Sequence, residues 1–275
     1  MKSKIVAALR LGGTAGLVGA LSACGPGGQK TAQTAPPPAP EVQASEAGYL
    51  VTPSVLAAER RPDGGVVLTG RAPPDSLVRL ASPEGDAFGA SAGADGGWRL
   101  ELAPVARARM FALSADVAGR PVHAQGALVV MPAPSPAALM VRAGYGALPV
   151  GQPGAQPRIV ALDYDSAGVA AVAGLATPRA TVQLTLDGAT AGQTRADARG
   201  RFAMLAPNHP LAAGPHLAAV TTPAGSAQLT VQIAPAAPLA TPYRAAREGS
   251  AWRIDWTPPG GGLQTTLVPD QGPAA

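Results

Sequence analysis

The most reactive side chain in this 275-residue sequence is the thiol of Cys24, the only cysteine of the chain. It directly follows Leu21, Ser22 and Ala23. A short basic start and an apolar stretch precede these residues, and this order is typical of a secretory signal that ends in small residues before a cut. If Cys24 is modified, the mature chain can form no disulfide, so its domains must depend on apolar cores.

The remaining groups that could do chemistry are few and scattered. The histidines, His123, His209 and His216, are not spaced like zinc ligands, and no nucleophile elbow, zinc-protease motif or phosphate loop is present. Asp163 and Asp165 resemble the carboxylate pairs that bind calcium between sandwich domains, but calcium needs six or more oxygens. Their alternate spacing predicts two solvated side chains on one strand face. We therefore expect no catalytic residue, no metal and no cofactor.

Trp252 and Trp256 form the one candidate binding face. The segment from residue 251 to 256 alternates strictly, which puts both indoles and Ile254 on one side of a strand. Residues 263–268 return as a second strand after a Pro- and Gly-rich turn, which predicts a hairpin. Exposed aromatics of this kind bind saccharides, whereas covered ones close an open sandwich face. Because an isolated hairpin is marginal and an exposed apolar patch is a liability, we expect this face to pack against the second domain or a partner.

The residues Leu21-Ser22-Ala23-Cys24 resemble the lipobox of bacterial lipoproteins at every position. The resemblance implies that Cys24 receives a diacylglycerol, that a signal peptidase cuts before it, and that the new amino group is acylated. The next residue is Gly25 rather than the aspartate of many inner-membrane lipoproteins, which implies an outer-membrane anchor facing the periplasm. The alternatives are an ordinary signal peptide or a membrane helix, although the apolar run is about half of the roughly 20 residues that a span needs.

Charge and composition limit the mature chain further. The formal net charge of +4 includes three cations and no acid within residues 1–23, which leaves +1 after removal of the signal. The high isoelectric point of 9.6 therefore gives no support to nucleic-acid binding. Aromatic residues make up 4% of the chain, beside 34 glycines and 30 prolines. Short runs of Val, Leu, Thr and Ile, broken about every 8 to 12 residues by Gly, Pro or Asp-Gly, predict an antiparallel all-β chain.

The body of the chain repeats at an offset of 104 residues, which predicts two domains of the same fold. In each copy a strand ends on glycine, a Pro-led turn and an alternating strand follow, and an aromatic residue comes after a glycine turn. We expect the aromatic pair to occupy the same core position. The pairs that share the offset are Gly70/Gly174, Pro74/Pro178, Leu80/Leu184, Trp98/Phe202 and Leu113/Leu217.

This arrangement resembles bacterial Ig-like domains, which occur in tandem on envelope proteins, and fibronectin-III-like or carboxypeptidase-regulatory-like modules share much of the pattern. The cysteine pair of antibody domains is missing. We expect an apolar piece between the copies, residues 137–141, to form an extra edge strand or part of the connector. The predicted division is a signal peptide (1–23), a lipidated Cys and Pro-rich tether (24–47), Ig-like domain 1 (48–132), a Pro-rich connector (133–154), Ig-like domain 2 (155–236), and a C-terminal hairpin and tail (237–275).

The sequence thus predicts a non-catalytic lipoprotein of the bacterial envelope that presents two β-sandwiches on a stalk, as a spacer, scaffold or protein-interaction module. The alternative is a cell-wall or glycan-binding module that uses the face of Trp252 and Trp256. An enzyme would need a site assembled from scattered Asp, Ser and His residues. The expected partners are the membrane, through the lipid, and an envelope protein or wall glycan. Nucleic acid is not expected as a partner.

Overall fold

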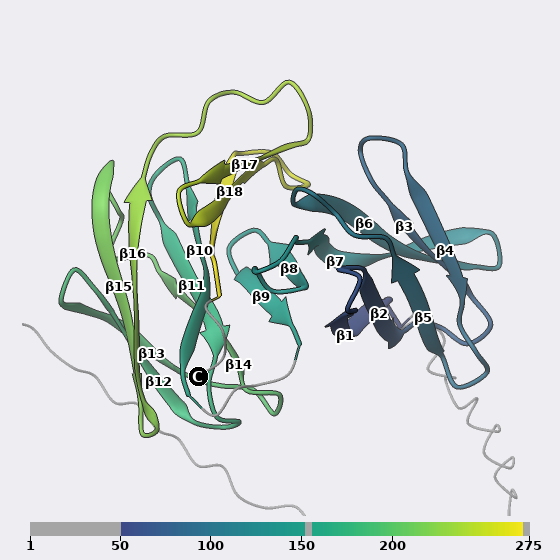
Figure 1. Cartoon of the computed structure of the whole chain (residues 1–275), viewed down its shortest axis with the longest axis horizontal. Helices are drawn as coiled ribbons and strands as arrows, with labels where there is room; N and C mark the ends of the chain where they lie inside the picture. The colour runs from purple at the N-terminus through teal and green to yellow at the C-terminus, as the bar shows by residue number, and fades with distance from the viewer. Residues whose placement is uncertain (1–50, 152–155, 272–275) are drawn as a thin grey trace, which may run out of the picture. The chain divides into compact units, whose positions relative to one another are not determined.

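The computed structural model describes residues 51–151 and 156–271, which fall within one compact unit that starts at Gly48. The predicted signal peptide (1–23), the lipobox with Cys24 and the tether (24–47) lie outside the described residues. Every regular element in the described part is a β-strand, from β1 to β19 (Figure 1). None of these residues belongs to a helix long and apolar enough to span a bilayer. The prediction of an all-β chain is confirmed.

The first sandwich places a three-stranded sheet of order β1-β2-β5 against a sheet that contains the run β4-β3-β6-β7. Alternate side chains of the two sheets meet in a core that includes Trp98, Phe111 and Leu128. Its strands are β1 (Ser54–Arg60), β2 (Val66–Arg71), β3 (Leu77–Ala81), β4 (Ala87–Ser91), β5 (Gly97–Leu102), β6 (Arg109–Val117) and β7 (Arg120–Val130).

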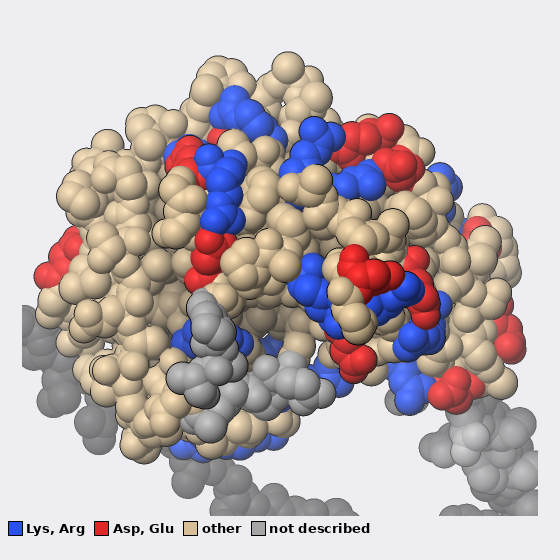
Figure 2. Space-filling view, in the orientation of Figure 1, with Lys and Arg blue, Asp and Glu red and all other residues tan. Residues whose placement is uncertain are grey.

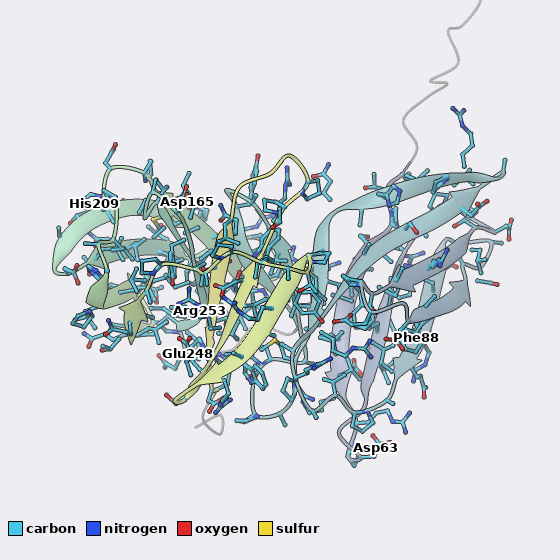
Figure 3. All side chains as sticks on the ribbon, turned by 90° about the horizontal axis from the view of Figure 1, so that it is seen from above. Asp63, Phe88, Asp165, His209, Glu248 and Arg253 are labelled. Atoms are coloured by element: carbon cyan, nitrogen blue, oxygen red, sulfur yellow. The ribbon has the colours of Figure 1, made fainter. Side chains whose placement is uncertain are left out.

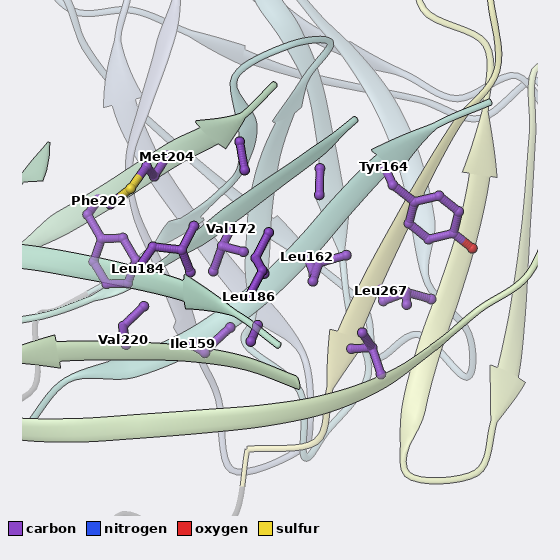
Figure 4. Close-up of a cluster of buried hydrophobic side chains, with 14 of the residues drawn as sticks. Ile159, Leu162, Tyr164, Val172, Leu184, Leu186, Phe202, Met204, Val220 and Leu267 are labelled. Atoms are coloured by element: carbon purple, nitrogen blue, oxygen red, sulfur yellow. The ribbon is translucent and has the colours of Figure 1, made fainter. Parts of the chain in front are cut away.

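The second sandwich repeats this strand order, with the run β14-β11-β10 facing a sheet of order β13-β12-β15-β16. Its core includes Leu162, Leu184 and Phe202 (Figure 4). Its strands are β10 (Arg158–Asp165), β11 (Ala170–Leu175), β12 (Thr181–Leu186), β13 (Ala189–Arg195), β14 (Arg201–Ala206), β15 (Gly214–Thr222) and β16 (Gly225–Ile233). The prediction of two tandem β-sandwiches is confirmed.

A glycine and an aromatic residue hold the same position in both copies. Gly70 pairs with Trp98 between β2 and β5, and Gly174 pairs with Phe202 between β11 and β14. A Cβ on either glycine would overlap the ring of its partner and a carbonyl oxygen of the neighbouring strand. The rings therefore reach the core only because these positions lack a side chain. Trp98 is 4% exposed and Phe202 is 2% exposed, which confirms their predicted core position.

The two copies correspond at an offset of 104 residues as far as their fifth strands, and this correspondence fails at the sixth strand. Leu80 pairs with Leu113, which is 1% exposed, whereas its counterpart Leu184 pairs with Val220. Leu217 is 38% exposed and does not enter the core. The predicted equivalence of Leu113 and Leu217 is wrong, because the connection from β14 to β15 is longer than the one from β5 to β6.

The predicted connector is folded as a hairpin of β8 (Ala138–Arg142) and β9 (Gly146–Val150). β8 pairs with β7 and β9 pairs with β8, so the sheet of the first sandwich extends to the order β4-β3-β6-β7-β8-β9. The apolar piece at residues 137–141 is thus a strand, and β9 covers its outer edge. A separate connector over residues 133–154 is a wrong interpretation, because most of this segment continues the first domain's sheet.

The C-terminal segment likewise continues the sheet of the second sandwich. β18 (Ala251–Trp256) and β19 (Gln264–Pro269) form the predicted hairpin, with Trp252 opposite Val268. β19 pairs with β10, and an additional strand, β17 (Tyr243–Glu248), pairs with β18. The sheet therefore has the order β14-β11-β10-β19-β18-β17. The predicted boundary at residue 237 does not separate an independent hairpin, because its backbone hydrogen bonds are made to the second sandwich.

A third core lies between these two extended sheets. In β7, Leu128 and Val130 face the core of the first sandwich, whereas Val129 between them faces the third core. Both faces of the sheet are therefore buried, which explains the unbroken apolar run in this strand. The described chain thus forms four sheet layers with three cores between them. The main side chains of the third core are Met110, Val129, Met131, Leu139, Val160, Leu175, Tyr243, Trp252, Ile254, Trp256 and Val268.

Replacing Gly174 by alanine should destabilise the second sandwich strongly. The new Cβ would overlap Phe202 and the carbonyl oxygen of Arg158, so the aromatic side chain must leave its place in the core. Phe202→Ala should lower the free energy of unfolding by about 3 to 5 kcal/mol. We expect the loss for Gly174→Ala to approach that value in urea unfolding curves.

Gly151→Ala is the matched control, because a Cβ at Gly151 meets no atom within 4 Å among the described residues. Its effect should stay within about 0.5 kcal/mol. Equal stability of the Gly174 and Gly151 variants would contradict the proposed dependence on close packing.

Candidate functional site

The predicted aromatic face lies inside the molecule. Trp252 is 8% exposed, Ile254 is fully buried, and Trp256 is 3% exposed. All three belong to the third core, so the expectation that this face packs against protein is confirmed. A sugar ring cannot stack on indoles that are covered in this way. The glycan-binding alternative therefore loses the exposed face on which it depends.

Asp163 and Asp165 do not form a solvated pair. Asp163 is 6% exposed, and the prediction that it faces water is wrong because β10 is buried on both faces. Asp165 caps the following turn and accepts hydrogen bonds from the backbone N–H groups of Ala167 and Val169, each at 2.9 Å. No three His, Asp or Glu side chains of the described segments come together as a metal site requires.

Asp163 is instead the centre of a buried hydrogen-bond network. Its carboxylate accepts hydrogen bonds from the backbone N–H of Ala147 in β9, at 2.7 Å, and from the hydroxyl of Thr266 in β19. The Thr266 hydroxyl in turn accepts a hydrogen bond from the indole N–H of Trp256, at 3.2 Å. Burial raises the pKa of Asp163 to about 7, against the lowering effect of its two hydrogen bonds. The network links the hairpin of the first sandwich to three strands of the second.

A second network surrounds Asp255 on β18, which is 1% exposed. Its carboxylate accepts hydrogen bonds from Arg253 at 2.9 Å, from the Thr265 hydroxyl at 2.8 Å, and from Arg244 at 2.7 Å. Arg253 also donates to the carbonyl oxygen of Ala234, just after β16, at 3.0 Å. Figure 3 labels Arg253 on the C-terminal strands. A buried carboxylate with partners on several strands fixes the C-terminal strands to the second sandwich, because any shift would leave a buried charge unpaired.

A further polar contact joins the two sandwiches at Tyr243 in β17. Its hydroxyl donates a hydrogen bond of 2.5 Å to the carboxylate of Glu84, in the turn between β3 and β4. Burial and the neighbouring Glu84 raise the pKa of Tyr243 above its ordinary value. A hollow of about 530 Å³ opens beside this contact, and its walls include Arg107 and Arg244. Sequence reasoning missed this contact, because β17 lacks a clear apolar alternation.

The histidines are dispersed over the described surface. His123 is exposed on β7, and His209 follows β14. The ring of His216 lies 2.7 Å from the Asp187 carboxylate and 2.8 Å from the carbonyl oxygen of Ala212. The Asp187 contact raises the pKa of His216. These contacts tie a turn to β15 and bring no nucleophile to the imidazole within the described residues.

Comparison with known proteins finds no family for this chain and only distant structural neighbours. No family model matches the sequence, and no curated protein matches it. Among solved structures, the central fibronectin-III array of RIM-binding protein is 12% identical over 76% of this chain and 72% of its own, with a TM-score of 0.27. The BSP domain of a biofilm-associated protein is 16% identical over 67% and 30%, with a TM-score of 0.22. Domains from titin are 13% identical over 80% and 89%, with a TM-score of 0.20.

Asp163→Asn should flatten the dependence of stability on pH. Because the pKa of Asp163 is raised in the folded state, the folded chain holds this proton more tightly than the unfolded chain. The resulting stability is full below about pH 3.8 and is lost as the pH rises through about 7. A difference of this size corresponds to up to about 4 kcal/mol. Urea unfolding at pH 5 and pH 8 should show that the Asp163→Asn variant gains stability relative to the unchanged chain at the higher pH.

Glu59→Gln is the control, because it removes an exposed carboxylate from β1 of the first sandwich. Its pH dependence should match that of the unchanged chain. If Asp163→Asn shifts stability by the same amount at both pH values, Asp163 does not titrate in this range.

Proposed function

We propose that this chain is a non-catalytic lipoprotein of the bacterial cell envelope, in which two sandwiches act together as a spacer or protein-interaction module. The in-register residues Leu21-Ser22-Ala23-Cys24 support the lipid anchor. Two or three acyl chains, at about 0.8 kcal/mol for each buried methylene, hold a protein far more stably than one chain does. Gly25 supports the outer membrane as the destination.

The third core is the observation that carries the spacer role. Tandem domains joined by an exposed linker normally move relative to each other. Here the segment between the sandwiches forms β8 and β9, and the side chains of both sandwiches share one apolar core. The Asp163 network and the contact of Tyr243 with Glu84 add polar links across it. An anchored protein of this design would present its partner with one arrangement of the two sandwiches.

The burial of Trp252 and Trp256 favours an envelope protein over a wall glycan as the partner. In place of an aromatic platform, the described surface offers strand edges, charged turns and shallow hollows. Such surfaces suit contacts between proteins, in which charge complementarity guides orientation.

Cys24→Ser should leave an unprocessed precursor that keeps residues 1–23. The hydroxyl cannot take the place of the thiol that receives the lipid, and the chain has no other cysteine. Mass spectrometry of the N-terminus should find acyl groups on Cys24 in the unchanged protein and an intact signal in the variant. Ser22→Ala keeps a small residue in the lipobox and should be processed normally. An unmodified mature N-terminus, or a cut elsewhere, would overturn the anchor.

Replacing Ala147 by arginine should separate the two sandwiches and leave the core of each sandwich undisturbed. Ala147 is fully buried in the third core, on a strand outside both seven-stranded sandwiches. The longer side chain must push β9 away from β10 and β11. Small-angle X-ray scattering should show a larger maximum dimension, with an unchanged circular dichroism spectrum.

Ala189→Arg makes the same change at an exposed position of β13 and should leave the scattering profile unchanged. If the Ala147 variant is folded and scatters like the unchanged protein, the third core does not fix the spacing of the sandwiches.

A further inference from the structure

One end of the second sandwich carries a group of arginines, here called the arginine end. Its members stand at strand ends and in turns. Three of them are exposed and two are partly exposed. They are Arg158, Arg179, Arg195, Arg199 and Arg201.

The fold brings these arginines together from three neighbouring segments. Arg158 and Arg201 each pair with Leu175 from opposite sides, so they share one row and one face of the sheet. The backbone N–H of Arg179 donates to the carbonyl oxygen of Asp197 at 3.3 Å, which joins the β11–β12 turn to the β13–β14 turn. Arg195 ends β13 next to these turns, as the partner of Thr181.

The charge of the arginine end is poorly balanced. Asp197 is the acidic residue within these segments, and it forms an ion pair with Arg201 at 2.8 Å. Its pKa lies below the ordinary value, because hydrogen bonds from Arg201 and Arg199 outweigh the effect of burial. Within the described part of the chain, Arg158, Arg179 and Arg195 form no salt bridge. Their guanidinium groups are available to a ligand outside the chain.

The first sandwich provides an internal comparison, because its strands pair in the same register. The positions 104 residues earlier hold no arginine and include two aspartates. Arg179 and its counterpart Asp75 even share a left-handed backbone, with φ of 65° and 57°. The fold therefore does not require the arginines. The counterpart residues are Ser54, Asp75, Ser91, Asp95 and Gly97.

The arginine end lies beside the point where the chain enters the folded unit. Arg199 donates a hydrogen bond of 3.4 Å to the carbonyl oxygen of Leu56, near the start of β1. Leu56 is close in sequence to Val51, the first described residue. The proposed lipid-bearing tether precedes Val51 in the sequence. Figure 2 shows arginine side chains along the lower edge of the second sandwich. The basic groups therefore lie beside β1, the strand with which the described chain begins.

We propose that the arginine end binds the phosphate groups of an anionic phospholipid surface, the membrane that the lipid on Cys24 enters. This inference rests on the proposed function, because the lipid on Cys24 is what would hold the chain at a membrane. A guanidinium presents a planar fork that matches phosphate oxygens, and basic residues near an anionic surface strengthen membrane binding. An acyl anchor and a basic patch together give two signals that hold one face against the bilayer.

The composition of the turns favours a lipid surface over an acidic protein. Besides arginine, they hold small side chains such as Pro178, Ala180 and Ala198. The aromatic anchors that dominate the centres of protein interfaces are absent from these turns. Contacts made only by guanidinium groups suit a fluid layer of phosphates, which needs no shaped pocket.

The test uses the mature polypeptide from residue 24 with Cys24→Ser, so that no lipid contributes to binding. It should co-sediment with vesicles that contain phosphatidylglycerol, but not with vesicles of phosphatidylcholine alone, and 0.5 M salt should release it. The triple variant Arg179→Asp, Arg195→Ser, Arg199→Asp installs the residue types of the first sandwich. It should bind the anionic vesicles roughly 100-fold more weakly, at about fivefold for each arginine.

The control variant Arg79→Ser, Arg107→Asp, Arg120→Asp makes the same charge change at exposed positions of the first sandwich. It should keep most of the vesicle binding, and thermal unfolding should show that both variants are folded. Equal weakening of the two variants would overturn the proposal, because general charge would then explain the binding. Failure of the unchanged polypeptide to prefer anionic vesicles would also overturn it. Neither result bears on the lipid anchor, which mass spectrometry of Cys24 tests separately.

Discussion

The apolar contact between the two sandwiches is the constraint on which the rest of the structure depends. It gives the facing sheets two buried sides each, so their central strands have little room for polar residues. All six residues of β11 are buried, and four of them are Ala or Gly, which lets neighbouring layers approach closely. The few large side chains, Trp252 and Trp256 above all, fill the wider space under the C-terminal strands. Aromatic residues make up 4% of the chain, and two of its three tryptophans lie in this core between the two extended sheets.

Polar groups inside such a contact must be paired, and their pairing fixes the register of the strands. Asp163 receives its hydrogen bonds from β9 and β19, and Asp255 receives its own from β17, β18 and β19. Sliding one of these strands by a residue would turn its side chains to the other face and leave a buried carboxylate without donors. Apolar packing alone tolerates such slips more easily. The two networks therefore specify the arrangement that the third core stabilises.

Local patterns in the sequence predicted the strands, the aromatic residues after the glycine turns and the C-terminal hairpin, because each depends on a few neighbouring residues. The burial of Asp163 was not predictable in this way. Alternation along a strand predicts solvated side chains only where one face of the strand meets water. In β10 both faces are buried. The sequence left β8 open between an edge strand and part of a connector, and β9 and β17 were missed. Prolines surround β8 and β9, and β17 is largely exposed. Their stability comes from sheets that the chain completes far away in sequence, such as the pairing of β19 with β10.

The contact between the sandwiches is not symmetric, and this raises the question of whether the free side of the second sandwich could form the same contact. The first copy contributes the sheet with β4-β3-β6-β7 to the contact, and the second contributes the sheet with β14-β11-β10. The four-stranded sheet of the second copy is therefore free, and a heterologous contact of this kind can repeat. The strand pairs give the answer. Phe111 opposite Leu128 and Ala218 opposite Leu229 point inward in the two copies.

The next pair along each ladder points outward. In the first copy it is Met110 and Val129, which enter the third core. In the second copy it is Leu217 and Thr230, which lie on the exposed side. Because Thr230 is polar and Leu217 is its exposed partner, this face is unsuited to packing in another apolar core. Terminal repeats of repeat proteins likewise have a polar outer face. The pair formed by Leu217 and Thr230 therefore gives the second sandwich an outer face that differs from the buried one of the first.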